Sequence, residues 1–332
     1  MQTIGILGAG TFGIALSRLL SQNGHTVTVW SHNADHLASL DHSRRHPKLP
    51  QMVIPSRVHF SASLPEVCQN KDVLLFAVPS VYVREVAHNT SPYLPDGQLI
   101  IDVAKGIEPE TLLTMCGVLE NELDRPDRHV RLVALSGPTH AEEIAADIPT
   151  TIVSASKDAA AAALVQDLCM NTCLRVYTNS DMLGVELSGA MKNVMALAAG
   201  IAAGAGGGDN TKAALITRGM AEIARLGCAM GCRKETFYGL AGIGDLIVTA
   251  MSRHSRNNQA GLLIGQGVSP DQAIAQIGMV VEGLNTLPAA MELRKRYDIE
   301  LPIVETVHAI VSGKTAPAQG IRTLMERDKK PE

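Results

Sequence analysis

Short apolar runs alternate with helically spaced stretches through the first half of the chain. Strands that are covered by helices on both faces carry continuous apolar sequence, so we interpret the runs as strands of a parallel sheet. Helices are expected between most of them, with Ile14 to Leu20 forming one and others near 81–89, 108–122 and 158–170. Strands are expected at residues 1–7, 26–30, 73–78, 99–103, 131–135, 151–155 and 174–177. This alternation predicts a doubly wound α/β domain.

The pattern changes near Asp181. From Met182 onward the segments are rich in Ala, Leu, Met and Glu at helical spacing, which predicts helices and no further strands. A length of 332 residues also favours two domains. We therefore expect an α/β domain over residues 1–181 and an all-α domain over residues 182–332.

A glycine-rich turn follows the first expected strand and precedes a helix. Its sequence is Gly8-Ala9-Gly10-Thr11-Phe12-Gly13, in the G-x-G-x-x-G spacing of dinucleotide sites. Gly8 permits the tight turn, Gly10 lets the backbone approach a pyrophosphate, and Gly13 lets the helix pack close to the strand. The amides at the helix N-terminus attract phosphate. The glycine spacing, with a strand before it and a helix after it, predicts a Rossmann-type dinucleotide site.

The end of the second expected strand carries no carboxylate. Ser31-His32-Asn33 follow Trp30, whereas an NAD-selective site has an acidic residue here that binds the ribose 2′-hydroxyl. Without that charge a 2′-phosphate is not repelled, and His32, Arg44 or Arg45 can bind it. The sequence therefore predicts a site that accepts NADP, with NAD also possible.

Composition excludes several other classes of protein. The net charge of −4 and an aromatic content of 3% do not favour a nucleic-acid partner. The longest stretch of small apolar residues, 194–208, is too short to insert into a membrane, and the apolar start lacks a basic leader. We expect a cytoplasmic protein.

The six cysteines do not form a C-x-x-C motif. Cys169 and Cys173 are spaced i, i+4, as are Cys228 and Cys232, so each pair would share a helical face if its segment were helical. No histidine completes either pair at zinc spacing, so we interpret the cysteines as buried thiols and expect no metal site.

Polar residues that follow the expected strands are the first candidates for binding a ligand, because ligands lie beyond the carboxyl ends of such strands. Lys105 follows one strand, and Gly137 and Thr139 follow the next. Plainer interpretations are a solvated surface lysine and an ordinary Gly-Pro turn.

The helical half contributes basic and acidic candidates. Lys192 lies among apolar residues, where it is either extended to the surface or held in a cleft. A lysine partly removed from water exchanges its proton near neutral pH, as a general acid for ketone reduction must. Asp245 is surrounded by glycines, and Ser255-Arg256-Asn257 has the composition of a phosphate clamp or of a polar helix start.

Taken together, these motifs resemble those of the bacterial-type NAD(P)-dependent glycerol-3-phosphate dehydrogenases over nearly the whole chain. The resemblance implies hydride transfer between sn-glycerol 3-phosphate and dihydroxyacetone phosphate, supply of glycerol 3-phosphate for phospholipid synthesis, and a helical domain of the 6-phosphogluconate dehydrogenase C-terminal type. The segments that carry it are Gly8–Gly13, Ala77–Ser80, Ala104–Gly106, Leu135–Thr139, Met191–Asn193, Ala213–Gly219, Gly242–Leu246 and Ser255–Asn257.

The resemblance also implies a role for individual residues. Lys192 would be the general acid and base and would also contact the substrate, and Lys105 and Asp245 would orient it. The other substrate-binding residues would be Lys105, Gly137, Thr139, Asp245, Ser255, Arg256 and Asn257. Besides the three glycines, the cofactor would contact Thr11, Phe12, His32, Lys105, Ala141, Arg256, Val280 and Glu282.

Two alternatives remain open at this point. Dehydrogenases of the β-hydroxyacid or 6-phosphogluconate type also pair a Rossmann domain with helices and a lysine followed by asparagine, although Gly244-Asp245-Leu246 and Ser255-Arg256-Asn257 favour glycerol 3-phosphate. An NAD(H)-binding redox sensor would not need Lys105, Lys192 and Asp245 together.

His140 stands where the family often has Phe, and its role is open. We expect a homodimer.

Overall fold

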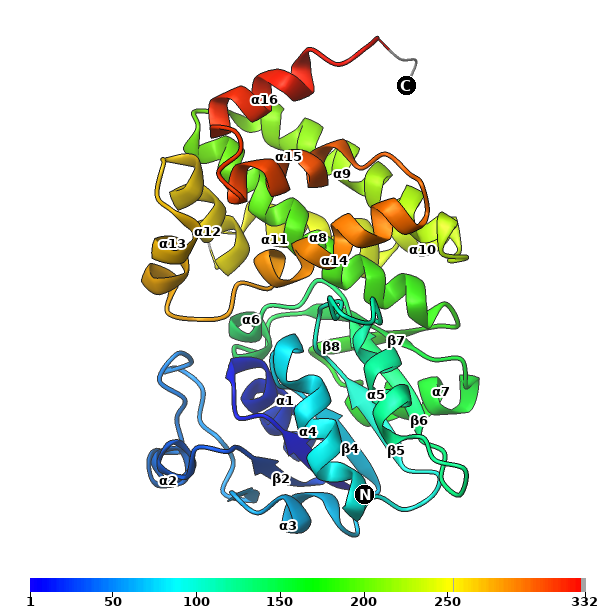
Figure 1. Ribbon diagram of the computed structural model, residues 1–332. Helices are drawn as coiled ribbons and strands as arrows, with labels where there is room; N and C mark the ends of the chain where they lie inside the picture. Colours follow the sequence, from blue (N-terminus) through cyan, green and yellow to red (C-terminus); the bar gives the residue numbers. More distant parts are fainter. Residues whose placement is uncertain (253, 330–332) are drawn as a thin grey trace. The chain divides into compact units, whose positions relative to one another are not determined.

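The computed structural model describes residues 1–252 and 254–329, which form two compact units (Figure 1). Unit 1 consists of Met1–Lys105 and Leu113–Glu186, and unit 2 consists of Gly106–Leu112 and the described residues from Leu187 onward. The units divide inside a helix rather than before it, so the predicted domain limits 1–181 and 182–332 stay a prediction.

Unit 1 is built on one sheet of eight strands in the order β3-β2-β1-β4-β5-β6-β7-β8. The strands are β1 (Thr3–Leu7), β2 (Thr26–Trp30), β3 (Val58–Ser61), β4 (Val73–Phe76), β5 (Leu99–Asp102), β6 (Arg131–Ser136), β7 (Thr150–Ala155) and β8 (Leu174–Asn179). The first six strands across the sheet, β3-β2-β1-β4-β5-β6, have the order of the doubly wound dinucleotide fold, which confirms the predicted fold class.

The sheet differs from the expected all-parallel one at a single junction. β7 pairs antiparallel with β6, through Ala134 opposite Ala155, while β8 runs parallel to β7. Only the short α6 (Ala141–Ala145) separates β6 from β7.

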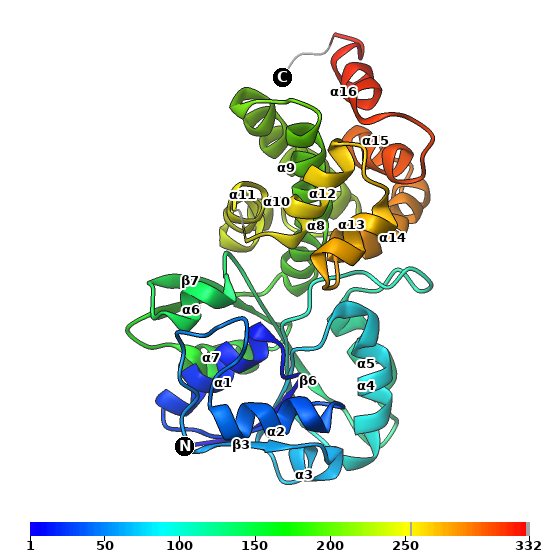
Figure 2. The same cartoon turned by 90° about the vertical axis from the view of Figure 1, so that its left-hand side faces the viewer.

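Helices cover both faces of the sheet in unit 1. Figure 2 shows α1 and α7 on one face and α4 and α5 on the other. The helices are α1 (Thr11–Gln22), α2 (Ala34–Ser43), α3 (Leu64–Cys68), α4 (Val83–Thr90), α5 (Met115–Leu123), α6 and α7 (Ala159–Cys169), with 3₁₀ turns η1 (Ser80–Tyr82) and η2 (Ser91–Tyr93). Strand residues such as Ile4, Ile6, Leu74 and Leu75 are fully buried between these layers.

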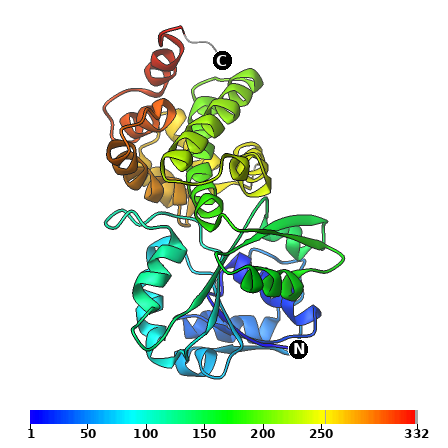
Figure 3. The same ribbon diagram turned by 90° about the vertical axis from the view of Figure 1, so that its right-hand side faces the viewer.

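Unit 2 consists of helices, as predicted for the C-terminal half (Figure 3). They are the C-terminal part of α8 (Met182–Gly204), α9 (Asp209–Ala229), α10 (Lys234–Phe237), the π-helical turn η3 (Leu240–Gly244), α11 (Asp245–Met251), α12 (Arg256–Gly265), α13 (Pro270–Ile277), α14 (Glu282–Arg296), α15 (Pro302–Val311) and α16 (Pro317–Met325). In unit 2, α8 is buried nearly all round, because it carries apolar side chains on every face.

Glycines let α8 and α12 approach backbone to backbone. A Cβ at Gly200 would lie 2.1 Å from the carbonyl oxygen of Asn258, and one at Gly261 would lie 2.2 Å from that of Leu197. Gly204 and Gly265 repeat the pattern one turn later, each 2.2 Å from a carbonyl oxygen of the facing helix. This contact fixes α12 against the C-terminal part of α8.

Candidate active site

The glycine-rich turn between β1 and α1 has the geometry that its sequence predicts. Gly8 has φ +125°, and a Cβ there would lie 2.6 Å from the carbonyl oxygen of Ala77. A Cβ at Gly13 would lie 2.2 Å from the carbonyl oxygen of Gly8, so these two glycines are required by packing. A Cβ at Gly10, in contrast, would meet nothing within 4 Å. The backbone at Gly10 therefore faces space that a ligand can enter.

The N-terminus of α1 presents its amides beside that space. Gly10 is the N-cap and no side chain caps the helix, nor does an acidic residue lie in its first turn. Thr11 and Phe12 begin this helix. Amides and the positive end of the helix dipole bind anions, so this turn fits the pyrophosphate of a dinucleotide.

The residues after β2 are organised around the start of α2. The Asn33 side chain caps α2 by accepting from the amide of His36 at 2.9 Å, while His32 beside it is exposed. Arg44 donates to the carbonyl oxygen of Val58 at 2.8 Å and Arg45 donates to that of Pro50 at 2.6 Å. Both arginines thus brace the loop between α2 and β3; of the three predicted 2′-phosphate contacts, His32 and Arg45 are exposed and Arg44 is half-buried.

Three predicted substrate residues meet at the carboxyl ends of β5 and β6. Lys105 Nζ donates to the carbonyl oxygen of Gly137 at 3.1 Å, and Thr139 Oγ1 donates to the same oxygen at 3.2 Å. Ala141 lies just beyond, as the first residue of α6, and His140 is its N-cap. Neighbouring strands that end at the same edge bring these residues together within unit 1.

The predicted catalytic lysine lies inside unit 2, paired with a carboxylate. Lys192, on α8, is 6% exposed, and Asp245, at the start of α11, is 1% exposed. Lys192 Nζ donates to Asp245 Oδ1 and, at 2.6 Å, to Thr249 Oγ1. The ammonium is therefore held by two fixed acceptors rather than extended to the surface.

Local structure explains why Asp245 meets Lys192. The π-helical turn η3 precedes α11, and a Cβ at Gly242 would lie 2.0 Å from the carbonyl oxygen of Phe237. Thr249 follows Asp245 by one helical turn and donates to its backbone carbonyl at 2.7 Å. Sequence reasoning missed Thr249, although its i, i+4 spacing from Asp245 was a signal.

Ser255, Arg256 and Asn257 form the start of α12. Ser255 Oγ caps the helix by accepting from the amide of Asn258 at 3.2 Å, and Arg256 donates to the carbonyl oxygen of Val280 at 3.1 Å. Asn257 donates to Asn193 Oδ1 at 3.0 Å and accepts from the amide of Gly283 at 2.8 Å. Arg256, Val280 and the helix that begins at Glu282 are thus neighbours, whereas the Asn257 side chain joins three helices.

The predicted residues therefore fall into two groups, each complete within its unit. The group in unit 2 contains Lys192, Asp245, Ser255, Arg256, Asn257, Val280 and Glu282. The group in unit 1 contains the glycine turn, His32, Lys105, Gly137, Thr139 and Ala141. The group in unit 1 fits the phosphates of a dinucleotide, and the group in unit 2 holds the buried ammonium of Lys192.

Comparison with known proteins decides between the dehydrogenase classes. The family described as NAD-dependent glycerol-3-phosphate dehydrogenase N-terminus matches residues 3–162, and the C-terminal family of the same enzymes matches residues 181–322. The chain belongs to the NAD-dependent glycerol-3-phosphate dehydrogenase family. The predicted resemblance is confirmed, and the β-hydroxyacid and 6-phosphogluconate alternatives are set aside.

Individual relatives agree with this assignment. A glycerol-3-phosphate dehydrogenase [NAD(P)+] of Lactobacillus delbrueckii subsp. bulgaricus is 57% identical over 100% of this chain and 99% of its own. One of Agathobacter rectalis is 46% identical over 99% of this chain and 97% of its own. The crystal structure of glycerol-3-phosphate dehydrogenase from Coxiella burnetii has a TM-score of 0.93 and 34% identity, over 98% of this chain and 99% of that one.

The cysteine pairs of this dehydrogenase do not make helical faces. Cys169 is the last residue of α7, and Cys173 lies beyond it. Cys228 lies in α9, which ends at Ala229, so Cys232 lies outside the helix. The expectation of buried thiols was wrong for Cys228, which is exposed, and for Cys173, which is only half-buried.

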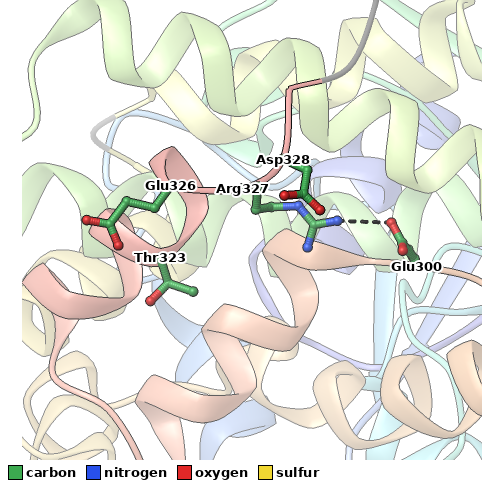
Figure 4. Close-up of a pocket in the computed structure, with 5 residues that line it drawn as sticks. All are labelled: Glu300, Thr323, Glu326, Arg327 and Asp328. Carbon is green, nitrogen blue, oxygen red and sulfur yellow. Dashed lines mark hydrogen bonds and ion pairs between the residues drawn. The ribbon is translucent and has the colours of Figure 1, made fainter.

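The dehydrogenase also has a surface hollow apart from the predicted residues. Figure 4 shows this hollow, which has a volume of about 540 Å³, with Arg327 paired to Glu300 at 2.9 Å. Its other lining residues are Thr323, Glu326 and Asp328. Three carboxylates around one guanidinium do not suit a phosphorylated substrate.

Among the described residues, no helix is long and apolar enough to span a membrane.

Proposed function

We propose that this dehydrogenase interconverts sn-glycerol 3-phosphate and dihydroxyacetone phosphate, with Lys192 as the general acid and base. The observation that carries the proposal is the buried Lys192 ammonium, bound to Asp245 and Thr249. A buried lysine fixed by two acceptors has a defined direction for proton donation, which a surface lysine lacks.

Ketone reduction requires a proton donor at the carbonyl oxygen, and the bound nicotinamide supplies the hydride. Lys192 donates its proton as negative charge develops on that oxygen, and takes the proton back in the oxidation direction. Asp245 stabilises the ammonium and, with Thr249, orients Nζ. The predicted Lys192–Asp245 partnership gains support from this contact.

The phosphorylated substrate requires further cations and donors. We assign these roles to Lys105, Gly137 and Thr139 in unit 1, and to Ser255, Arg256 and Asn257 in unit 2. Arg256 supplies a planar donor fork suited to phosphate. The hydroxyl of Ser255 and the amide of Asn257 also support the start of α12 and so hold Arg256 in place.

The nucleotide would bind along Gly8–Gly13, with its pyrophosphate at the N-terminus of α1. The contacts assigned to Thr11, Phe12, His32, Lys105, Ala141, Arg256, Val280 and Glu282 complete this site. We propose a preference for NADP, because no acidic residue at positions 31–33 repels a 2′-phosphate.

Three finer points belong to the same proposal. The enzyme supplies glycerol 3-phosphate for phospholipid synthesis, and it works in the cytoplasm. It forms a homodimer, which exposed apolar side chains in unit 2 support, namely Tyr238, Ile247 and Met251.

Lys192→Ala tests the proposal. We expect kcat to fall by ~100-fold or more, the usual worth of general acid catalysis, while NADPH still binds. Lys234→Ala, at an exposed lysine of α10, is the matched control and should keep its kcat. A Lys192→Ala enzyme with normal kcat would remove Lys192 from this role. Wild-type enzyme that never consumes NADPH or NADH with dihydroxyacetone phosphate would overturn the reaction itself.

A further inference from the structure

Three acidic groups meet in the interior of unit 1, outside the residues assigned so far. They are Asp102 at the end of β5, Cys116 in the first turn of α5 and Glu186 in the part of α8 that belongs to unit 1. One carboxylate oxygen of Asp102, one of Glu186 and the Sγ atom of Cys116 all lie within 4.8 Å of one another. All three residues are buried.

Glu186 is well provided with donors. It accepts from the hydroxyl of Thr114 at 3.0 Å and from the amide of Cys116 at 2.7 Å, and the Cys116 thiol also hydrogen-bonds to it. These donors lie at the N-terminus of α5, where the helix dipole favours negative charge. Burial nevertheless raises the pKa of Glu186 to about 7. Negative charge in this cluster is therefore best placed on Glu186.

Asp102 has a different environment. It is 2% exposed; Oδ1 accepts from the amide of Ala104 at 3.2 Å, and Oδ2 is buried without a hydrogen-bond partner. A buried carboxylate with so few donors is costly, and protonation removes the cost. Burial and the neighbouring Glu186 both raise the pKa of Asp102 well above its usual range.

The Ala104 amide links Asp102 to the loop that carries Lys105. Val103 continues the sheet by donating to the carbonyl oxygen of Phe76 at 3.1 Å, so the chain leaves the sheet at Ala104. The Asp102 side chain holds that amide, and the next residue, Lys105, reaches Gly137. A side chain that accepts from the amide two residues later fixes a turn.

We propose that Asp102 is a positioning residue whose carboxyl group is neutral in the working enzyme, and that it holds the loop that presents Lys105 to the substrate. This rests on the role given to Lys105 under the proposed function. Protonation removes the charge from the unpartnered Oδ2, while Oδ1 keeps the Ala104 amide. The charged and titratable groups around the cluster are Glu186 and Cys116 themselves, with Lys157 acting on Glu186 and Glu120 on Cys116.

A divalent cation is the competing occupant of such a cluster. The Cys116 thiol argues against it, because its proton is engaged with Glu186 and its pKa is raised well above the usual range by burial and by Glu186 and Asp102. A metal would need the thiolate. The cluster therefore favours a retained proton.

Paired substitutions at Asp102 test the proposal. Asn reproduces the neutral acid, with one oxygen for the Ala104 amide and one donor, so Asp102→Asn should keep kcat and KM within about 2-fold of wild type. Asp102→Ala removes the acceptor and should raise KM for dihydroxyacetone phosphate by about 5-fold or more, the scale of one lost hydrogen bond, with a smaller change in kcat. Asp127→Ala, at an exposed aspartate, is the matched control and should leave both constants unchanged. Equal damage from Asn and Ala would show that Asp102 works as a charged group and would overturn the proposal.

Infrared spectroscopy of the full-length enzyme gives a readout that does not depend on activity. We expect a band of a protonated buried carboxyl group at pH 8 that Asp102→Asn removes, and this comparison still decides if Asp102→Ala does not fold. A wild-type spectrum without that band would contradict a neutral Asp102. One tightly bound divalent metal per chain, lost in Asp102→Asn or in Cys116→Ala, would also overturn the proposal. If wild-type enzyme failed to reduce dihydroxyacetone phosphate, the proposed function would fall while the band would still report on Asp102.

Discussion

Glu222 gives unit 2 a pH-dependent stability that can be predicted quantitatively. This residue of α9 is buried and accepts from the amides of Ile303 at 2.8 Å and Val304 at 3.4 Å, so it caps the N-terminus of α15. Burial raises its pKa from 4.5 to about 7, against the lowering effect of those two amides and Arg225. The folded protein therefore binds the Glu222 proton more tightly than the unfolded chain does.

The sign and size of the effect follow from this difference. Below pH 4.5 the proton is bound in both states, and the contribution to stability is fully present. As the pH rises toward 7 the unfolded chain has already released the proton, so folding free energy is lost progressively. The gap between 4.5 and about 7 corresponds to roughly 3 kcal/mol at ~1.4 kcal/mol per pH unit.

Glu222→Gln removes the titration and keeps the side-chain shape. We expect the free energy of unfolding in urea to change in favour of the variant by about 2–3 kcal/mol between pH 5 and pH 8, relative to wild type, because part of the effect already falls below pH 5. Comparing the change across pH cancels any fixed loss of hydrogen bonding. Glu110→Gln, at an exposed glutamate, should show a profile parallel to wild type. A Glu222→Gln profile that is also parallel would refute the reasoning.

The remaining predictions concern glycines and the phosphate clamp. Gly261→Ala places a Cβ 2.2 Å from the carbonyl oxygen of Leu197, so the free energy of unfolding should fall by about 1–3 kcal/mol. Gly208→Ala is the control, because a Cβ there meets nothing within 4 Å, and its free energy of unfolding should fall by less than about 1 kcal/mol. Gly10→Ala should leave stability nearly unchanged but weaken NADPH binding by ~10-fold or more, measured by the fluorescence of the single tryptophan. Unchanged NADPH binding would argue against a pyrophosphate site at this turn. Arg256→Ala should raise KM for dihydroxyacetone phosphate by ~10-fold or more, as loss of a charged hydrogen bond does, and an unchanged KM would refute the clamp.

Features written in short, local patterns were predictable from the sequence. The Gly8–Gly13 turn, the apolar strand runs and the helical second half each depend on neighbouring residues, and the structure has them at or near the predicted positions. β3 was missed because Val58-His59-Phe60-Ser61 is short and half polar. The helix expected near 108–122 begins only at Met115, because Pro109 disfavours a helical residue before it and Leu112 has φ +62°.

Features that depend on contacts between distant segments could not be predicted. The Lys192–Asp245 pair was suggested by resemblance alone, since 53 residues separate the two positions. The capping role of Glu222 and the cluster around Asp102 had no local signature that set them apart from ordinary polar residues. Similarly, Asn257 looked like a ligand contact by composition, although its amide binds Asn193 and Gly283.

The central claim is that the buried Lys192 moves the proton during ketone reduction. Its most direct test is the turnover of Lys192→Ala with NADPH and dihydroxyacetone phosphate, measured with and without small primary amines. We predict a fall of ~100-fold or more without amine, and partial recovery that rises with amine concentration, while NADPH binding stays near the wild-type value. Turnover within a few-fold of wild type in the absence of amine would contradict the account.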